Sequence, residues 1–125
     1  MDVYLIDDDS DEAELFGEAV RRIDMSIHVT AFDNGIDAIS AITNGDQKPD
    51  IIFLDLNMPL LSGKEILVQL KLDERSSGIP VVIYSTSISE HDVEETSDYG
   101  VKSYLQKPEN LRTLCEKLRE LLLES

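Results

Sequence analysis

Residues 51–59 read IIFLDLNMP, with four consecutive apolar residues followed directly by Asp55. A second unbroken apolar run covers residues 81–84 and ends in Ser85. Apolar runs that do not alternate with polar residues are typical of strands buried on both faces of a parallel sheet. The two runs therefore indicate a buried sheet with polar side chains at the ends of two strands.

Outward from this stretch, short apolar runs alternate with amphipathic segments. The predicted strands are residues 3–6, 27–32, 51–54, 81–84 and 101–105, and the predicted helices are residues 11–23, 37–42, 64–72, 90–98 and 110–123. The last helix has the clearest apolar stripe, and Cys115 lies on it, so we interpret this cysteine as a core residue. The alternation predicts βαβ units, hence an α/β fold with a parallel sheet and helices on both faces.

Composition limits the classes of function. The 125 residues suit one domain, residues 1–125, and no linker suggests an output domain. Eleven basic against 26 acidic residues give a net charge of −15, which argues against direct nucleic-acid binding, although acidity for solubility explains most of these carboxylates equally well. No apolar stretch is long enough for membrane insertion, no signal peptide is evident, and the single cysteine is compatible with the cytoplasm.

The polar residues that follow the apolar runs are the candidate site. In open parallel sheets, ligands bind outside the carboxyl ends of the strands. At those ends the chain carries two clusters and two single residues: Asp7-Asp8-Asp9, Asp55, Ser85-Thr86 and Lys107. We therefore expect these side chains to converge on one crevice.

Carboxylates gathered at one edge of a sheet need a cation. Two such charges about 4 Å apart repel by roughly 4 kcal/mol at an effective dielectric near 20. Mg²⁺ binds one or two carboxylates, keeps several waters and accepts phosphate oxygens. We assign Asp7, Asp8 and Asp55 to such a metal site, whereas Asp9, which precedes a helix, is interpreted as its N-cap.

Asp55 is the candidate nucleophile, because a strand-end carboxylate can form an aspartyl phosphate. Phosphoryl transfer requires mainly positioning and charge neutralisation around the phosphoryl oxygens. Ser85 can donate a hydroxyl hydrogen bond, Lys107 can supply a cation, and the backbone N–H of Thr86 can bind a further oxygen.

Taken together, these motifs resemble the receiver domain of two-component response regulators over essentially the whole chain. The resemblance rests on Asp7-Asp8, residues 53–59 with Gly63, Ser85, Tyr104, and Lys107-Pro108. It implies a flavodoxin-like, doubly wound (βα)5 fold with strand order 2-1-3-4-5. It also implies a phosphoacceptor at Asp55 and Mg²⁺ held by Asp8, Asp55 and the backbone carbonyl of Asn57, with Asp7 acting mainly through water.

The same resemblance implies a switch rather than an ordinary enzyme, one that catalyses only its own phosphorylation and dephosphorylation. Ser85 and Lys107 would contact the phosphoryl group, and Ser85 and Tyr104 would change conformation together. A cis Lys107–Pro108 bond is expected. The expected partners are a sensor histidine kinase or phosphotransfer protein and an unknown downstream protein, with the chain a monomer or weak homodimer.

Two other functions remain open from the sequence. A phosphatase of the haloacid-dehalogenase type also phosphorylates a strand-end Asp, but it normally has a second Asp where this chain has Asn57, and it has a cap domain. A pseudo-receiver scaffold would fold alike without being phosphorylated. Such proteins usually lack the nucleophile, the metal acids or the lysine, all of which are present here.

Overall fold

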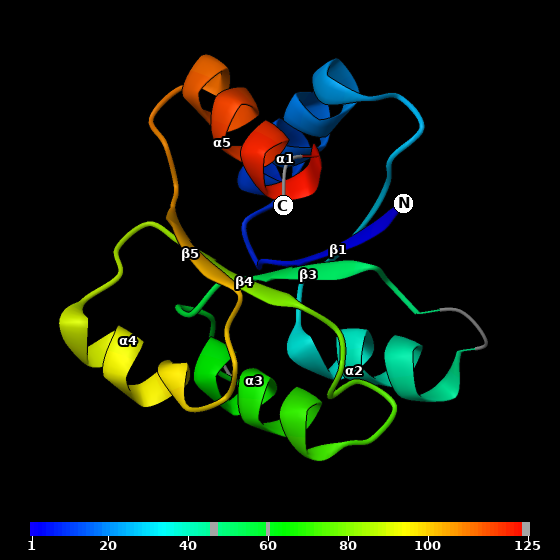
Figure 1. Cartoon of the computed structure of the whole chain (residues 1–125), viewed down its shortest axis with the longest axis vertical. Helices are drawn as coiled ribbons and strands as arrows, with labels where there is room; N and C mark the ends of the chain where they lie inside the picture. The colour runs from blue at the N-terminus through cyan, green and yellow to red at the C-terminus, as the bar shows by residue number, and fades with distance from the viewer. Residues whose placement is uncertain (46–47, 60, 124–125) are drawn as a thin grey trace.

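The computed structural model describes residues 1–45, 48–59 and 61–123 (Figure 1). Strands and helices alternate along these residues. In chain order they are β1 (Asp2–Ile6), α1 (Ser10–Ile23), β2 (His28–Phe32), α2 (Gly35–Asn44), β3 (Ile51–Leu54), α3 (Gly63–Leu72), β4 (Val81–Ser85), α4 (Glu90–Ser97), β5 (Ser103–Gln106) and α5 (Leu111–Leu123). The strands form one parallel sheet in the order β2-β1-β3-β4-β5, which confirms the predicted fold and strand order.

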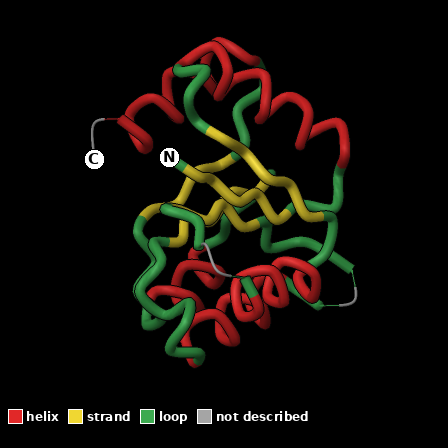
Figure 2. The backbone as a smooth tube through the Cα atoms, turned by 90° about the vertical axis from the view of Figure 1, so that its right-hand side faces the viewer, coloured by secondary structure: helices red, strands yellow, loops and turns green. Residues whose placement is uncertain are grey.

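The sheet lies between two layers of helices (Figures 1 and 2). Helices α1 and α5 cover one face, and α2, α3 and α4 cover the other. Each face has its own apolar cluster: Phe53 packs toward α1 and α5, whereas Ile52 and Leu54 pack in the cluster of the opposite face. All four residues of β3 are buried, which is why its apolar run is unbroken.

Side-chain caps fix where the helices begin. The carboxylate of Asp9 accepts hydrogen bonds from the backbone N–H groups of Asp11 and Glu12, so its predicted role as the N-cap of α1 is confirmed. Cys115, on α5, is half-buried and packs against the cluster beneath α1, as expected of a core residue. No helix in the described part of the chain is long and apolar enough to cross a membrane.

The structure corrects two predictions in the last third of the chain. Residues 101–102 precede β5 rather than belonging to it, because Val101 packs against the apolar cluster after a turn at Gly100, whose φ is 71°. No peptide bond between described residues is cis, so the predicted cis Lys107–Pro108 bond is wrong. The bond is trans, the form that X–Pro bonds intrinsically prefer by about 0.5–1 kcal/mol.

Candidate functional site

Backbone hydrogen bonds continue the sheet by one residue beyond its strands and so place the candidate site residues. The N–H of Asp55 donates to the carbonyl of Ile6 at 3.0 Å, and the N–H of Lys107 donates to the carbonyl of Ser85 at 2.8 Å. Similarly, the N–H of Asp7 donates to the carbonyl of Phe32 at 3.0 Å. The carboxyl ends of the strands are thereby aligned, and the predicted convergence of side chains occurs there.

Asp7, Asp8 and Asp55 form one acidic cluster. A carboxylate oxygen from each lies within 4.8 Å of the others; Asp7 and Asp55 are buried, and Asp8 is exposed. Burial raises the pKa of Asp7 above its usual value, and the charge of Asp55 adds to this, whereas Lys107 and the backbone N–H of Asp9 oppose it. Oδ2 of Asp7 is buried without a well-directed hydrogen bond, despite its proximity to Lys107. These oxygens fit a hard divalent cation.

Lys107 supplies the positive charge of the site. Its Nζ lies 2.7 Å from Oδ2 of Asp7 and 3.4 Å from Oδ2 of Asp55, and only 6% of its side chain is exposed. Burial alone would lower the pKa of Lys107, but its contact with Asp7 and the charges of both carboxylates outweigh burial and raise the pKa. The ammonium group therefore stays charged inside the crevice.

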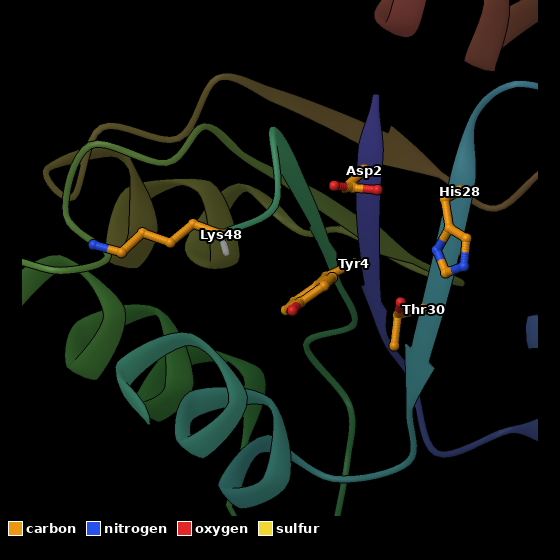
Figure 3. Close-up of a pocket in the computed structure, with 5 residues that line it drawn as sticks. All are labelled: Asp2, Tyr4, His28, Thr30 and Lys48. Carbon is orange, nitrogen blue, oxygen red and sulfur yellow. The ribbon is translucent and has the colours of Figure 1, made fainter. Parts of the chain in front are cut away.

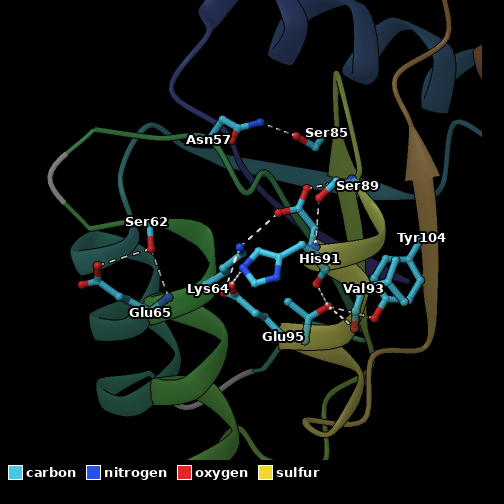
Figure 4. A network of polar contacts seen from close by, with 12 residues as sticks. Asn57, Ser62, Lys64, Glu65, Ser85, Ser89, His91, Val93, Glu95 and Tyr104 are labelled. Atoms are coloured by element: carbon cyan, nitrogen blue, oxygen red, sulfur yellow. Dashed lines mark hydrogen bonds and ion pairs between the residues drawn. The ribbon is translucent and has the colours of Figure 1, made fainter.

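Ser85 and Asn57 hold the other oxygen of Asp55. The Ser85 hydroxyl and the backbone N–H of Asn57 donate to Oδ1 of Asp55 at 3.0 and 3.1 Å. The side-chain amide of Asn57 in turn donates to Oγ of Ser85 at 3.0 Å (Figure 4). The bond between Asn57 and Ser85 was not predicted from the sequence, because a role was assigned to the backbone carbonyl of Asn57 and none to its side chain.

Gly63 allows the loop after β3 to fold back against Asp55. Its N–H donates to the carbonyl of Leu56 at 3.2 Å. A Cβ at this position would lie 2.2 Å from the carbonyl oxygen of Asp55 and 2.5 Å from Cα of Leu56, both backbone atoms that cannot move aside cheaply. The glycine of the motif is therefore required by close packing against the backbone of the nucleophile.

The two remaining predicted residues, Thr86 and Tyr104, lie outside the acidic cluster. Thr86 directly follows β4, and its side chain is exposed. Tyr104, on β5, is half-buried, and its hydroxyl lies 2.8 Å from Oγ1 of Thr96 on α4 (Figure 4). Thr96 donates its single hydroxyl proton to the carbonyl of Asp92 at 2.7 Å, so the Tyr104 hydroxyl is the donor to Thr96.

Helix α4 is held mainly by polar contacts. Lys64 on α3 pairs with Asp92 at 3.0 Å and with Glu95 at 2.9 Å (Figure 4). His91 also contacts Glu95, and Thr96 is the buried residue of the helix. The sequence of α4, EHDVEETS, is acidic and contains a single aliphatic residue, so the helix has little apolar surface with which to pack.

Two of the surface pockets differ in their relation to the candidate site. One extends from Asp7 and Asp8 across the start of α1 toward β2 and the start of α2, with Glu14, Asp33 and Asp37 in its lining, so the acidic cluster is approached through an acidic surface. The other lies at the amino ends of β1 and β2, away from the cluster, and contains no predicted site residue (Figure 3). It is lined by Asp2, Tyr4, His28, Thr30 and Lys48.

Comparison with known proteins identifies the family. The family described as the response regulator receiver domain matches residues 3–119. The probable methanogenesis regulatory protein FilR2 of Methanothrix harundinacea is 31% identical over 128 residues, covering 97% of this chain and 83% of that protein. This chain therefore belongs to the response regulator receiver family of two-component signalling.

Solved structures agree with this assignment. The phosphorylated cyanobacterial phytochrome response regulator RcpA is similar with a TM-score of 0.87 and 31% identity, over 98% of this chain and 93% of that one. The Mn²⁺-bound form of response regulator Rcp1 gives a TM-score of 0.86 and 27% identity, over 99% of this chain and 95% of that one. The acidic cluster of Asp7, Asp8 and Asp55 fits the phosphoacceptor site of a receiver.

Proposed function

We propose that this protein is a phosphoacceptor switch in two-component signalling. Asp55 takes the phosphoryl group from a phosphohistidine of a sensor histidine kinase or phosphotransfer protein, and the phosphorylated form presents a changed face to a downstream protein. The observation that carries this proposal is the buried carboxylate of Asp55, bound by Ser85 through one oxygen and facing Lys107 with the other. The structurally similar response regulator RcpA was solved in its phosphorylated form, which supports the same chemistry in this protein.

The proposed transfer is a single displacement at phosphorus. A carboxylate oxygen of Asp55 attacks, a P–O bond forms, the P–N bond to the donor imidazole breaks, and the imidazole leaves with that electron pair. Lys107 neutralises charge on the phosphoryl oxygens, and Ser85 turns its hydroxyl from Asp55 to one of them. The backbone N–H of Thr86 binds another oxygen.

The proposed cofactor is Mg²⁺. Asp8, Asp55 and the backbone carbonyl of Asn57 would hold it, with Asp7 acting mainly through water. When bound, the ion would screen the carboxylates and neutralise charge on the phosphoryl group. The buried Oδ2 of Asp7, which pairs with Lys107 without a well-directed hydrogen bond, and the exposed Asp8 support a hydrated cation at this place, as does the Mn²⁺ bound by Rcp1.

Phosphorylation is proposed to act on Tyr104 through Ser85. When Ser85 moves toward the phosphoryl group, the space it leaves can be entered by Tyr104, which becomes more buried. Here Tyr104 is half-buried and bonded to Thr96, so entry requires this bond to break.

We further propose a cytoplasmic location and a monomeric or weakly dimeric state.

The phosphatase alternative is disfavoured by Asn57. Its amide donates to Ser85 and has no proton to exchange as a general acid or base near pH 7. A pseudo-receiver scaffold is disfavoured because the cluster retains its acids, hydroxyl and lysine in mutual contact.

The deciding experiment is incubation with acetyl phosphate and Mg²⁺, followed by intact-protein mass spectrometry. We expect the mass of one phosphoryl group on the wild type and on Asp98→Asn, which removes an exposed acid after α4. Asp55→Asn and the wild type treated with a chelator should gain none. A wild type that gains no phosphoryl mass from acetyl phosphate or from a phosphohistidine donor would leave the scaffold as the better account.

A further inference from the structure

The aromatic ring of Tyr84 lies against the ammonium group of Lys107. Tyr84 precedes Ser85 on β4, and successive strand residues point to opposite faces. Its side chain therefore enters the apolar cluster beneath α1 and α5, where it is 1% exposed. Nζ of Lys107 lies 5.4 Å from the centroid of this ring, a separation at which a cation is attracted to an aromatic face.

The ring is itself firmly held. Phe16 of α1 and Phe53 of β3 meet it edge to face, with centroids 5.5 and 6.2 Å away. Phe16 and Phe53 also contact each other at 5.0 Å. Three interlocked rings in a close-packed core leave little freedom for rotation, so Tyr84 presents a fixed surface to Lys107.

We infer that Tyr84 is a positioning residue for phosphoryl transfer, whose ring keeps the Lys107 ammonium group directed into the crevice beside Asp55. This inference rests on the proposed function. Lys107 is otherwise held by the charges of Asp7 and Asp55, and a divalent cation bound to those acids weakens both attractions. The ring contact does not depend on the charge of the acids, so it persists when the site is loaded and the lysine is needed.

The first test observes the contact without any phosphorylation. Because Nζ of Lys107 lies over the ring, protons on the neighbouring carbon should resonate upfield of those of the exposed Lys102. Mg²⁺ should not abolish this ring-current shift. Tyr84→Phe should retain the shift, and Tyr84→Leu should lose it. An unshifted Lys107 in the wild type would overturn the inference, whether or not the protein accepts phosphate.

The second test separates positioning from core packing. Phosphorylation by acetyl phosphate with Mg²⁺ should slow about 5- to 30-fold in Tyr84→Leu, the range between an exposed and a desolvated cation–ring contact. It should be nearly normal in Tyr84→Phe and in Val20→Ala, which truncates a core residue away from the site. Tyr84→Met, whose unbranched side chain has about the same volume as Leu but a different shape, should be slowed like Tyr84→Leu.

A double-mutant cycle completes the second test. In a Lys107→Ala background, Tyr84→Leu should slow phosphorylation no further, because the group that the ring positions is already absent. The same fold-loss in both backgrounds would show that Tyr84 acts only through packing and would overturn the inference. A wild type that shows the ring-current shift but gains no phosphate would instead refute the proposed function.

Discussion

Lys107 lies closer to Asp7 than to Asp55, with Nζ to Oδ2 distances of 2.7 and 3.4 Å. The strongest ion pair of the site is therefore made with an acid that is not the candidate nucleophile. Asp7 keeps the lysine near Asp55 while leaving the nucleophilic carboxylate only partly engaged by it.

Removing the positive charge of Lys107 should leave the repulsion between the carboxylates of Asp7 and Asp55 uncompensated. Lys107→Met should lower the free energy of unfolding by about 3 kcal/mol without divalent cations, because two buried carboxylates lose their partner. Urea unfolding with and without Mg²⁺ measures this, and Mg²⁺ should stabilise the variant more than the wild type. Lys102→Met, at an exposed position, is the matched control. Equal stability of Lys107→Met and wild type would contradict the role given to this ion pair.

Mg²⁺ should raise the melting temperature through the acidic cluster. At about 100 times its Kd, a ligand of the native state adds roughly 2.7 kcal/mol. Asp8→Asn should lose most of this gain in thermal unfolding. Asp9→Asn should keep it, because Asn also caps helices and Asp9 is outside the cluster. If both variants lose this stabilisation equally, the ion is attracted by the overall negative charge of the protein and not by specific ligands in the acidic cluster.

Gly63→Ala should disturb the site through the backbone. The added methyl group would collide with the carbonyl oxygen of Asp55, and overpacking of this kind typically costs about 1–3 kcal/mol. Chemical denaturation gives the loss, and the rate of phosphorylation should fall with it. Gly78→Ala is a suitable control, because a Cβ there has no neighbour within 4 Å. Equal tolerance of the two substitutions would argue against the close approach.

Acid should weaken the contact of Asp73 with Arg75. The guanidinium and backbone N–H of Arg75 hold the pKa of Asp73 at about 2, against an ordinary value of 3.8. Because this folded-state pKa is lowered, the stabilisation is complete above pH 3.8 and is lost as pH falls from 3.8 toward 2. Denaturant midpoints of wild type and Asp73→Asn should therefore differ at neutral pH and converge near pH 2. The exposed neighbour variant Glu74→Gln should follow the wild type; a gap that is constant with pH would refute the assignment.

Thr96→Val should release Tyr104. The substitution removes the acceptor of the tyrosine hydroxyl, and a hydrogen bond is typically worth about 1 kcal/mol, roughly a fivefold change in rotamer ratio. NMR shifts of the Tyr104 ring should move toward those of the wild type with Mg²⁺ and a beryllofluoride phosphoryl mimic. Thr43→Val, which removes a hydroxyl from α2, should leave them unchanged. Unaltered Tyr104 shifts in Thr96→Val would show that this bond does not restrain the ring.

The fold was predictable because local signals and the global fold agree. Unbroken apolar runs marked β3 and β4, and Asp9 marked the start of α1, since each signal lies within a few neighbouring residues. The set of residues that meet at the carboxyl ends of the strands was predictable from parallel topology alone.

Contacts between distant side chains were not predictable in the same way. The Asn57–Ser85 bond, the Tyr84–Lys107 contact and the preference of Lys107 for Asp7 depend on rotamers and on packing between strands. Only the resemblance to the receiver family implies a cis Lys107–Pro108 bond, and this chain does not have it. Residues 101–102 were misassigned because Val101 is apolar like a strand residue but packs against the core from the loop that follows Gly100.

The free energy needed to displace helix α4 has a different physical origin from that of its neighbouring helices. With Thr96 as its buried residue, moving it would transfer little hydrocarbon into water, and the resistance comes mainly from the charges of Lys64, Asp92 and Glu95. Dissolved ions weaken these contact pairs as the screening length falls from about 10 Å at 0.1 M toward about 3 Å at 1 M, which is close to the distance between the paired charges. The position of this helix should therefore respond to ionic strength at salt concentrations that leave the apolar clusters, and so the rest of the fold, unaffected.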